Sequence, residues 1–421
     1  MKILLYCLNY SPELTGIGKY TGEQARWFAA RGHEVRVITA PPYYPAWRVG
    51  AGYRAWQYRR EQHDGVQVWR APLWVPSRPS GLKRVLHLAS FAASSLPCLL
   101  AQWRWRPDVV MVVEPPLLCS PAALLLGRWT GAKTWLHVQD YEVDAAFALG
   151  LLKQPLLRKL ACALERHAMA AFDRVSTISE AMLRLARDKG APEARTQLLP
   201  NWVDLRAIRP GRGSLYRRRL GIPADATVAL YSGNMGNKQG LEVLAQAARQ
   251  LRDRPDIWFV LCGDGAGRAA LEQACAGLPQ VRFLPLQPAS RFPALLAAAD
   301  LHLLPQRADA ADLVLPSKLA GMLASGRAVI ATAHAGTELA RLVARCGRVV
   351  APGDGLALAA AIEQLAADPA TRDTLGAAGR AWAERHLDRD AVLGRWEAAI
   401  QALCGEHTAV SVPAASVGTE Q

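Results

Sequence analysis

The stretch ALYSGNMGNKQGLEVL, residues 229–244, joins a short apolar run to a glycine-rich turn and then to a helical pattern. Strands that end in a turn and continue as a helix are the units of parallel, doubly wound sheets. Glycines in such a turn let backbone N–H groups at a helix N-terminus approach an anion closely. Lys238 lies in the turn, but Gln239 follows it, so this is not a GxxxxGK[ST] phosphate loop. The stretch predicts an anion site at the edge of an α/β sheet.

Short apolar runs of this kind alternate with helical patterns along most of the chain. The predicted strands are residues 2–8, 34–39, 66–70, 109–113, 134–138, 174–177 and 197–199 in the first half, and 227–232, 258–262, 281–284, 301–304, 328–331 and 347–350 in the second. This alternation favours an α/β fold with two Rossmann-like, doubly wound domains. Ligands of such sheets bind at the carboxyl ends of the strands, so we expect the site in a cleft between the domains.

The segment 199–214 is rich in proline, glycine and arginine and lacks a periodic pattern, which marks a domain boundary. We therefore expect a first domain over residues 1–200 and a second over residues 201–379. A C-terminal helix over about residues 380–404 is predicted to pack back on the first domain. Residues 406–421 are small and polar, and they are expected to form a flexible tail.

The composition narrows the class of protein. With 421 residues, 51% hydrophobic and 20% charged, the chain is neither disordered, collagen-like nor a coiled coil. Its eight cysteines form no CxxC pair, so we expect no zinc site, no disulfide framework and a reducing compartment. The N-terminal apolar run stops early at Pro12 and lacks a cleavage pattern, which favours a first strand in a cytoplasmic protein.

Positive charge is concentrated in the first half of the chain. The net charge is +14, of which +11 falls in residues 1–200. A basic domain favours an anionic partner, either nucleic acid or an anionic membrane surface, unless the whole composition is simply rich in arginine. No uninterrupted apolar run reaches the length of a membrane span, since Pro97 breaks the segment 88–103. That segment, flanked by basic residues and tryptophans, fits either an interfacial membrane contact or a buried helix.

A second glycine cluster, TGIGKYTGE at residues 15–23, follows the first strand. Its spacing is GxGxxxG, and the second strand ends in Ala40 instead of an acid, so a nicotinamide dinucleotide is not indicated. The backbone N–H groups near Gly16 and Gly18 are instead expected to hold a phosphate or hydroxyl oxygen, unless these glycines only pack a tight turn.

Three turns in the second half of the chain, including the one that contains Lys238, point to a nucleoside diphosphate. The sequence places Gly233 and Asn234 beside Lys238, Gly263 in the turn CGDG, and Ser317 and Lys318 at a predicted helix start. A helix N-terminus and a lysine both attract phosphate. Any one of these turns could be ordinary capping, but their repetition at successive strand ends favours a ligand site.

The segment HVQDYEVDAAF, residues 137–147, follows a strand that should end in the cleft. An imidazole or carboxylate there, from His137 or Asp140, could orient or deprotonate an acceptor hydroxyl. The simpler alternative is a helix N-terminus with favourable acids. The sequence contains no HExxH, GxSxG or EF-hand motif, so we expect no metal.

Together these motifs, with LPNWVD at residues 199–204 and LPSKLAGMLASGRAVIATA at residues 315–333, resemble the family 4 retaining glycosyltransferases of GT-B fold. The resemblance extends over residues 1–400. Within the family, PPYYPAW (residues 41–47), VQVWRAPLWVP (residues 66–76) and HVQDYEVDAAF are similar to the fucosyltransferases of colanic acid and related exopolysaccharide synthesis.

The resemblance implies a GDP- or UDP-linked nucleotide-sugar donor, with fucose from GDP-fucose favoured, and a polyprenyl-diphosphate-linked saccharide acceptor at the inner face of the plasma membrane. It also implies no cofactor and no nucleic-acid partner. Lys238 and the backbone near Ser317 and Lys318 would hold the donor phosphates, Asn234 would replace an arginine of many relatives, and Asp140, with His137 behind it, would address the acceptor. The family's paired glutamates would fall at Leu313 and Gly321, and neither is acidic.

Two other functions remain open at this point. A nucleotide-sugar isomerase or epimerase would bind the same donor and change it without an acceptor. A non-catalytic, membrane-associated partner in polysaccharide assembly would use the basic first domain to bind an anionic membrane and would release no nucleotide from the donor.

Overall fold

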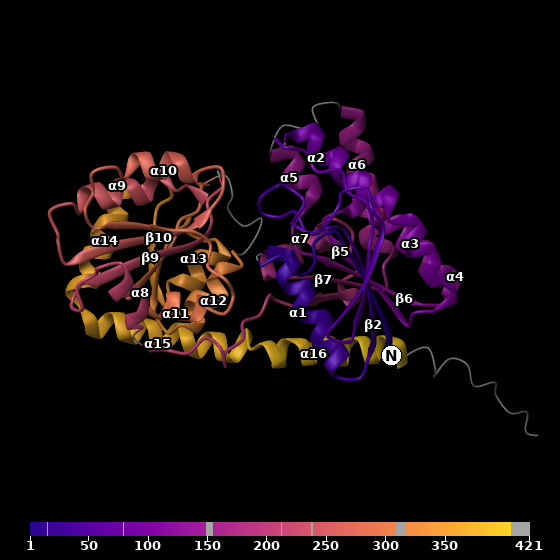
Figure 1. Ribbon diagram of the computed structural model, residues 1–421. Coiled ribbons are helices and arrows are strands. Elements are labelled where there is room, and N and C mark those ends of the chain that lie inside the picture. Colours follow the sequence, from indigo (N-terminus) through magenta and orange to yellow (C-terminus); the bar gives the residue numbers. More distant parts are fainter. Residues whose placement is uncertain are drawn as a thin grey trace, which may run out of the picture.

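The computed structural model describes residues 1–14, 16–78, 80–148, 155–211, 213–236, 239–308 and 316–405. Two α/β domains stand side by side, each with a central sheet covered by helices (Figure 1). The expected GT-B-like arrangement of two Rossmann-like domains is therefore confirmed. The predicted tail, residues 406–421, lies outside the described residues.

The first domain has strands β1 (Lys2–Cys7), β2 (Glu34–Thr39), β3 (Arg59–His63), β4 (Val66–Arg70), β5 (Val109–Glu114), β6 (Lys133–Val138), β7 (Arg174–Thr177) and β8 (Thr196–Leu198). Its helices are α1 (Gly16–Ala30), α2 (Gly81–Ser94), α3 (Leu96–Leu100), α4 (Ser120–Thr130), α5 (Glu142–Ala148), α6 (Pro155–Ala171) and α7 (Glu180–Asp188), with 3-10 turns η1 (Ala101–Arg104), η2 (Leu117–Cys119) and η3 (Glu193–Arg195).

The second domain has strands β9 (Thr227–Asn234), β10 (Ile257–Asp264), β11 (Val281–Leu284), β12 (Leu301–Leu304), β13 (Ala328–Thr332) and β14 (Gly347–Val350). Its helices are α8 (Ser214–Arg219), α9 (Glu242–Gln250), α10 (Arg268–Ala274), α11 (Phe292–Ala297), α12 (Lys318–Ala324), α13 (Glu338–Val343) and α14 (Gly355–Ala367), and the chain ends in α15 (Pro369–His386) and α16 (Arg389–Gly405).

Each sheet has a topological switch point near its centre, where the order in which the chain adds strands reverses. The first sheet runs β3-β4-β2-β1-β5-β6-β7-β8, and the second runs β11-β10-β9-β12-β13-β14. In each case the chain moves outward on one side of the central strand and then returns to build the other side. Ligands bind at such switch points, outside the carboxyl ends of the strands. The switch points are β1/β5 in the first domain and β9/β12 in the second.

Strand β3 is the one strand of the described sheets that the apolar pattern does not predict. It is polar and mostly exposed, and it pairs antiparallel with β4 at the edge of the first sheet. The turn between them is Asp64-Gly65, and both residues have positive φ, 50° and 78°. An Asp-Gly pair with this geometry is a strong hairpin signal, so the turn could have revealed a strand that hydrophobicity does not.

The C-terminal helices pass beneath both domains in succession (Figure 1). Helix α15 packs on the second domain, and α16 packs on the first, where Trp396 lies 5.3 Å from Trp135 between ring centroids. The helix that returns to the first domain thus begins at Arg389, later than the predicted residue 380. At the break between α15 and α16, the backbone N–H of Val203, in the interdomain crossing, donates to the carbonyl of Leu387 at 2.9 Å.

Candidate functional site

The end of β9 is shaped by glycines that allow two strands to approach. Gly233 and Gly263 are partners in the parallel β9/β10 register, and a Cβ on Gly263 would collide with the Gly233 carbonyl. Gly233 has φ +142°, a conformation that side chains rarely adopt. A Cβ there would also lie 3.4 Å from Lys318 Nζ. The two glycines therefore keep the end of the sheet open beside a lysine.

Lys318 projects its ammonium group toward this open end. Its Nζ donates to the Tyr231 hydroxyl at 3.0 Å and lies 4.3 Å from the centre of the Tyr231 ring. Burial of the ammonium lowers the pKa of Lys318 to about 7. Desolvation costs the charged form of a lysine, and a nearby anion restores it. The position is therefore suited to an anionic ligand.

Ser317 precedes α12, as predicted, but its side chain does not cap the helix. Its backbone is already helical, with φ −60° and ψ −24°, so the hydroxyl cannot reach back to the first free N–H groups as an extended N-cap would. The hydroxyl-bearing side chain is exposed, and its carbonyl accepts from the Tyr20 hydroxyl at 3.4 Å. Ser317 thus marks an interdomain contact in this structure.

Two positions of the predicted donor site, Lys238 and Leu313, lie outside the described residues. Gly321 is described, and it lies in α12 on the side of α11. A Cβ on Gly321 would meet Phe292 and Leu296, each at 3.5 Å. Its surroundings are therefore apolar.

In the first domain, Gly16 and Gly18 lie in the first turn of α1, beside the end of β1. Gly16 has φ +62°, and a Cβ on Gly18 would lie 2.5 Å from Glu13 Oε2. The sequence reasoning missed Glu13, whose buried carboxylate occupies the space that Gly18 leaves. An acid one turn before the glycine pair was the available signal.

Asp140 follows β6 at the same edge of the first sheet, and two glutamates lie with it. Glu114 ends β5 and is fully buried, and burial, followed by the charges of Glu142 and Glu165, raises its pKa well above the usual value. Burial also raises the pKa of Glu142 to about 7, with Asp140 adding to the effect. Glu142 accepts from the Leu117 backbone N–H at 2.8 Å. This edge is therefore a cluster of carboxyl groups, two of which have a raised pKa.

His137 lies in the core instead of the cleft. One ring nitrogen is 2.9 Å from Ser176 Oγ, and the other is 2.9 Å from the Gln139 side-chain nitrogen. The ring packs against Trp396 at 4.8 Å, and burial lowers its pKa to about 3. A neutral, enclosed imidazole with both nitrogens engaged cannot take a proton from a substrate. The geometry therefore supports a structural role for His137 and not the predicted catalytic one.

Gln139 connects the buried His137 to the segment that crosses between the domains. Its side-chain amide exchanges two hydrogen bonds with Asn201, each of 3.0 Å. Asn201 belongs to the LPNWVD motif where the chain leaves the first domain. His137 thereby supports the interdomain crossing through Gln139.

The two switch points face each other and touch at defined places. Asn234 Nδ2 donates to the Tyr44 hydroxyl at 3.3 Å, which joins the end of β9 to the loop after β2. At a separate place, Glu338 in the first turn of α13 accepts from the backbone N–H groups of Glu180 and Ala181, at 3.2 and 2.8 Å. Together with the contact between Tyr20 and Ser317, these hydrogen bonds join the two domains across the cleft.

Several large apolar side chains are exposed on the helices of the first domain. Leu82, Leu86, Leu100, Trp103 and Leu156 are exposed by 72, 51, 46, 54 and 77%. Among the described residues, the helical run Gly81–Arg104 is long and apolar enough to cross a membrane by length and composition. The sequence predicts a break of the apolar pattern at Pro97, but Pro97 lies in the first turn of α3, where a proline is tolerated, and the helical run continues. Phe91 and Leu99 of this run are buried in the domain core, so one face packs on the protein.

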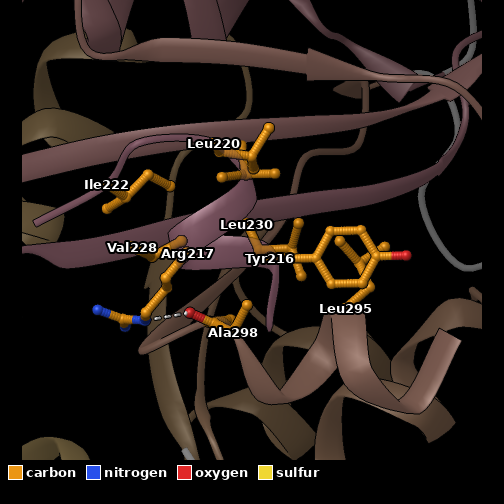
Figure 2. Close-up of a pocket in the computed structure, with 10 residues that line it drawn as sticks. Tyr216, Arg217, Leu220, Ile222, Val228, Leu230, Leu295 and Ala298 are labelled. Carbon is orange, nitrogen blue, oxygen red and sulfur yellow. Dashed lines mark hydrogen bonds between the residues drawn. The ribbon is translucent and has the colours of Figure 1, made fainter. Parts of the chain in front are cut away.

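The pocket in Figure 2 lies inside the second domain, between β9, α8 and α11. Leucine, isoleucine and valine side chains line most of it, and Arg217 is paired with Asp300 and donates to the Ala298 carbonyl at 3.0 Å. It is therefore a packing feature, away from the switch point. Within the described ranges, no group of three or more His, Cys, Asp or Glu side chains is arranged to hold a metal ion.

Two facing Rossmann-like domains with a lysine and open glycine turns at one switch point define a GT-B glycosyltransferase architecture. Two family descriptions match the chain: "Glycosyl transferase 4-like domain" over residues 15–202 and "Glycosyl transferases group 1" over residues 226–368. The chain belongs to this glycosyltransferase family.

Individual relatives agree with this assignment. The chain is 48% identical over 407 residues to WcaI of Escherichia coli (strain K12), which is named as a colanic acid biosynthesis glycosyl transferase; the match covers 93% of this chain and 98% of WcaI. Sucrose-phosphate synthase from Thermosynechococcus elongatus has the same fold, with a TM-score of 0.76 at 18% identity, covering 96% of this chain and 99% of that one. HepE of Anabaena, solved with UDP and glucose, has a TM-score of 0.69 at 18% identity and covers 96% and 100%.

Proposed function

We propose that this glycosyltransferase acts with retention of configuration and transfers fucose from GDP-fucose to a lipid-diphosphate-linked oligosaccharide during synthesis of a colanic-acid-like exopolysaccharide. The observation that carries the proposal is the opposition of the two switch points. A lysine and open glycine turns lie at the end of β9, and carboxyl groups lie across from them at the ends of β5 and β6. The similarity to WcaI supports the pathway.

In this proposal the second domain binds the nucleotide sugar and the first binds the acceptor. Lys318 and the backbone near Gly233 and Gly263 stabilise the charge on the departing diphosphate, which is where negative charge develops. Asp140 orients the acceptor hydroxyl. The reaction needs positioning and charge stabilisation and, in this proposal, neither a metal ion nor a cofactor.

A thermal-shift panel with GDP, UDP, ADP and NAD tests the donor class. A ligand at 100 times its dissociation constant stabilises the folded state by about 2.7 kcal/mol, so the bound nucleotide raises the melting temperature. Selective stabilisation by GDP supports the fucosyl donor. Stabilisation by UDP redirects the proposal to other hexoses, and a response to NAD alone contradicts it.

Turnover assays separate a transferase from the other two functions. A transferase releases nucleoside diphosphate only when both donor and lipid-linked acceptor are present. An isomerase or epimerase converts the donor alone, and an assembly partner releases nothing. Lys238→Ala is expected to reduce turnover by about 100-fold or more with little change in melting temperature, since one lost charge-stabilising group has effects of this size.

We also propose that the chain works in the cytoplasm as a peripheral protein on the inner face of the plasma membrane. The apolar face of α2, α3 and η1 is flanked by Lys83, Arg104 and Arg106, which are exposed. Apolar side chains with adjacent cations suit an interfacial contact with anionic lipid. The burial of Phe91 and Leu99 favours a helix that lies on the membrane over one that crosses it.

Vesicle sedimentation tests the membrane contact. The variant carrying both Leu82→Glu and Leu86→Glu is expected to lose binding to anionic vesicles, because each buried leucine contributes roughly 1.5–3 kcal/mol. Leu356→Glu is the matched control, since Leu356 is 67% exposed on the second domain. Equal sedimentation of the wild type with and without vesicles at low salt would contradict the contact.

A further inference from the structure

Tyr44 lies where the two proposed substrate sites meet. It belongs to the loop between β2 and β3, and its side chain is half-buried. Its hydroxyl accepts the hydrogen bond from Asn234 Nδ2. A Cβ on Gly16 would lie 3.6 Å from the Tyr44 ring, so the ring rests against the glycine turn of the first domain. One side chain therefore contacts both glycine-rich segments.

The backbone of Tyr44 is fixed by Glu13. Glu13 Oε1 accepts from the N–H groups of Tyr43 and Tyr44, each at 3.0 Å, and Oε2 accepts from Asn9 Nδ2 at 2.9 Å. This carboxylate is buried, and both of its oxygens are used. Hydrogen bonds to a charged acceptor in a buried place are stronger than neutral ones. Glu13 thus ties the loop after β1 to the loop that carries Tyr44.

The Tyr44 phenol lies between residues of the proposed acceptor site and residues of the proposed nucleotide-sugar site. The charges of Arg84 and Asp140 both act on Tyr44, and burial raises its pKa. On the other side, the carbonyl of Asn234 accepts from the Tyr231 hydroxyl at 2.6 Å, and Tyr231 is the partner of Lys318. A chain of hydrogen bonds therefore runs from Lys318 through Tyr231 and Asn234 to Tyr44.

We propose that Tyr44 is a positioning residue, held by Glu13, whose hydroxyl couples the donor loop at Asn234 to the acceptor domain. The inference rests on the proposed transfer reaction and gives Tyr44 a role that the motif PPYYPAW by itself does not assign. Transfer requires the donor carbon and the acceptor oxygen to be aligned, although they are bound by different domains. The Tyr44 contact is placed to fix that alignment in the closed cleft.

Tyr44→Phe removes the hydroxyl and keeps the ring. We expect the kcat of this variant to fall by about 3- to 10-fold, the scale of one neutral hydrogen bond. The KM for the nucleotide sugar should change by less than about twofold. Tyr43→Phe is the matched control. Tyr43 shares the Glu13 contact, but its ring packs in the core against Trp47 and His87. We expect its kcat to stay within about twofold of the wild type.

Amide hydrogen exchange measures the coupling between Tyr44 and the segment at Asn234 in the absence of substrate. Peptides that contain Gly233 and Asn234 are expected to exchange faster in Tyr44→Phe than in the wild type and in Tyr43→Phe. Unchanged exchange and unchanged kcat in Tyr44→Phe would overturn the inference, as would an equal loss in both variants. Absence of transfer by the wild type with every donor would overturn the proposed function, and the exchange result would then decide the role of Tyr44 separately.

Discussion

The two switch points of this protein have the same topology and opposite chemistry. At β9/β12 the strand ends are open, with glycines at Gly233 and Gly263 and the ammonium of Lys318 beside them. At β1/β5 the space is filled by carboxyl groups, among them the buried Glu13 and Glu114. The domain with the larger net positive charge therefore has the acidic site edge. This contrast shows that the charge of a domain does not predict the charge of its site, because most basic residues lie on the outside.

The contrast also suggests a division of labour. An anionic diphosphate is attracted to the ammonium of Lys318. The carboxyl groups across the cleft offer an anion no such attraction, and they can orient a neutral hydroxyl by hydrogen bonding. The two sides thus favour one orientation of the two proposed substrates over the reverse.

Removing the lysine should produce the largest effect on this contrast. Lys318→Met is expected to weaken binding of the nucleoside diphosphate by about 100-fold, the scale of a hydrogen bond to a charged group. Stability should not fall, because burial already makes the charged form costly. Calorimetric titration with GDP and UDP measures the change. Lys133→Met, at the amino end of β6, is the control, and equal weakening in both variants would contradict the assignment.

The next effect concerns the acidic side. The pKa of Glu142 is raised from 4.5 to about 7 in the folded protein, so its contribution to stability is present below pH 4.5 and is lost as the pH rises through 7. A shift of this size corresponds to roughly 3–4 kcal/mol. Glu142→Gln should therefore reduce the decline in unfolding free energy between about pH 5 and pH 8. Denaturant unfolding at both pH values checks this, and an unchanged decline would contradict the buried carboxyl cluster.

A smaller effect is expected in the pH dependence of ligand binding. Because the pKa of Lys318 is about 7 without ligand, a bound diphosphate should raise it and cause proton uptake. Affinity should then fall by up to about tenfold per pH unit above pH 7. Titrations in buffers of different ionisation enthalpy measure the proton uptake. Lys318→Met should lose this dependence, and its persistence would assign the proton to another group.

The smallest expected effect is that of replacing His137, which should change stability and leave turnover nearly unchanged. His137→Gln should lower the unfolding free energy by about 1 kcal/mol, the scale of a buried hydrogen bond, and leave kcat within about twofold. Ser176→Ala, which removes the partner of the imidazole, should behave similarly. A kcat loss of more than about tenfold in a folded His137→Gln protein would restore the catalytic role that the sequence suggests.

Much of the fold could be read from the chain because local signals agreed with the global arrangement. Apolar runs predicted the buried parallel strands, since strands covered on both faces are apolar throughout. Strand β3 escaped because an edge strand needs no apolar face, and only its Asp64-Gly65 turn marked it. The glycines at the ends of β9 and β10 were also found, because their spacing after a strand is a local pattern.

The rest of the site depended on contacts between distant segments. Glu13 and Tyr44 come from two loops and Asn234 from the end of β9, and no sequence spacing relates them. His137 had a suitable place at the end of a strand, but α16, more than 250 residues later, covers it. The direction of a side chain into the core or the cleft was not available before the sheets and the C-terminal helices were assembled.

The sequence by itself determined the parallel strands of the two sheets, their order along the chain and the glycine turns after β9 and β10, because periodicity and turn chemistry are local. Only the tertiary structure decided which charged groups are buried, and therefore which way their pKa values move. Desolvation depends on everything packed around a group. It gives Lys318 a lowered pKa and Glu142 a raised one at opposite sides of the cleft.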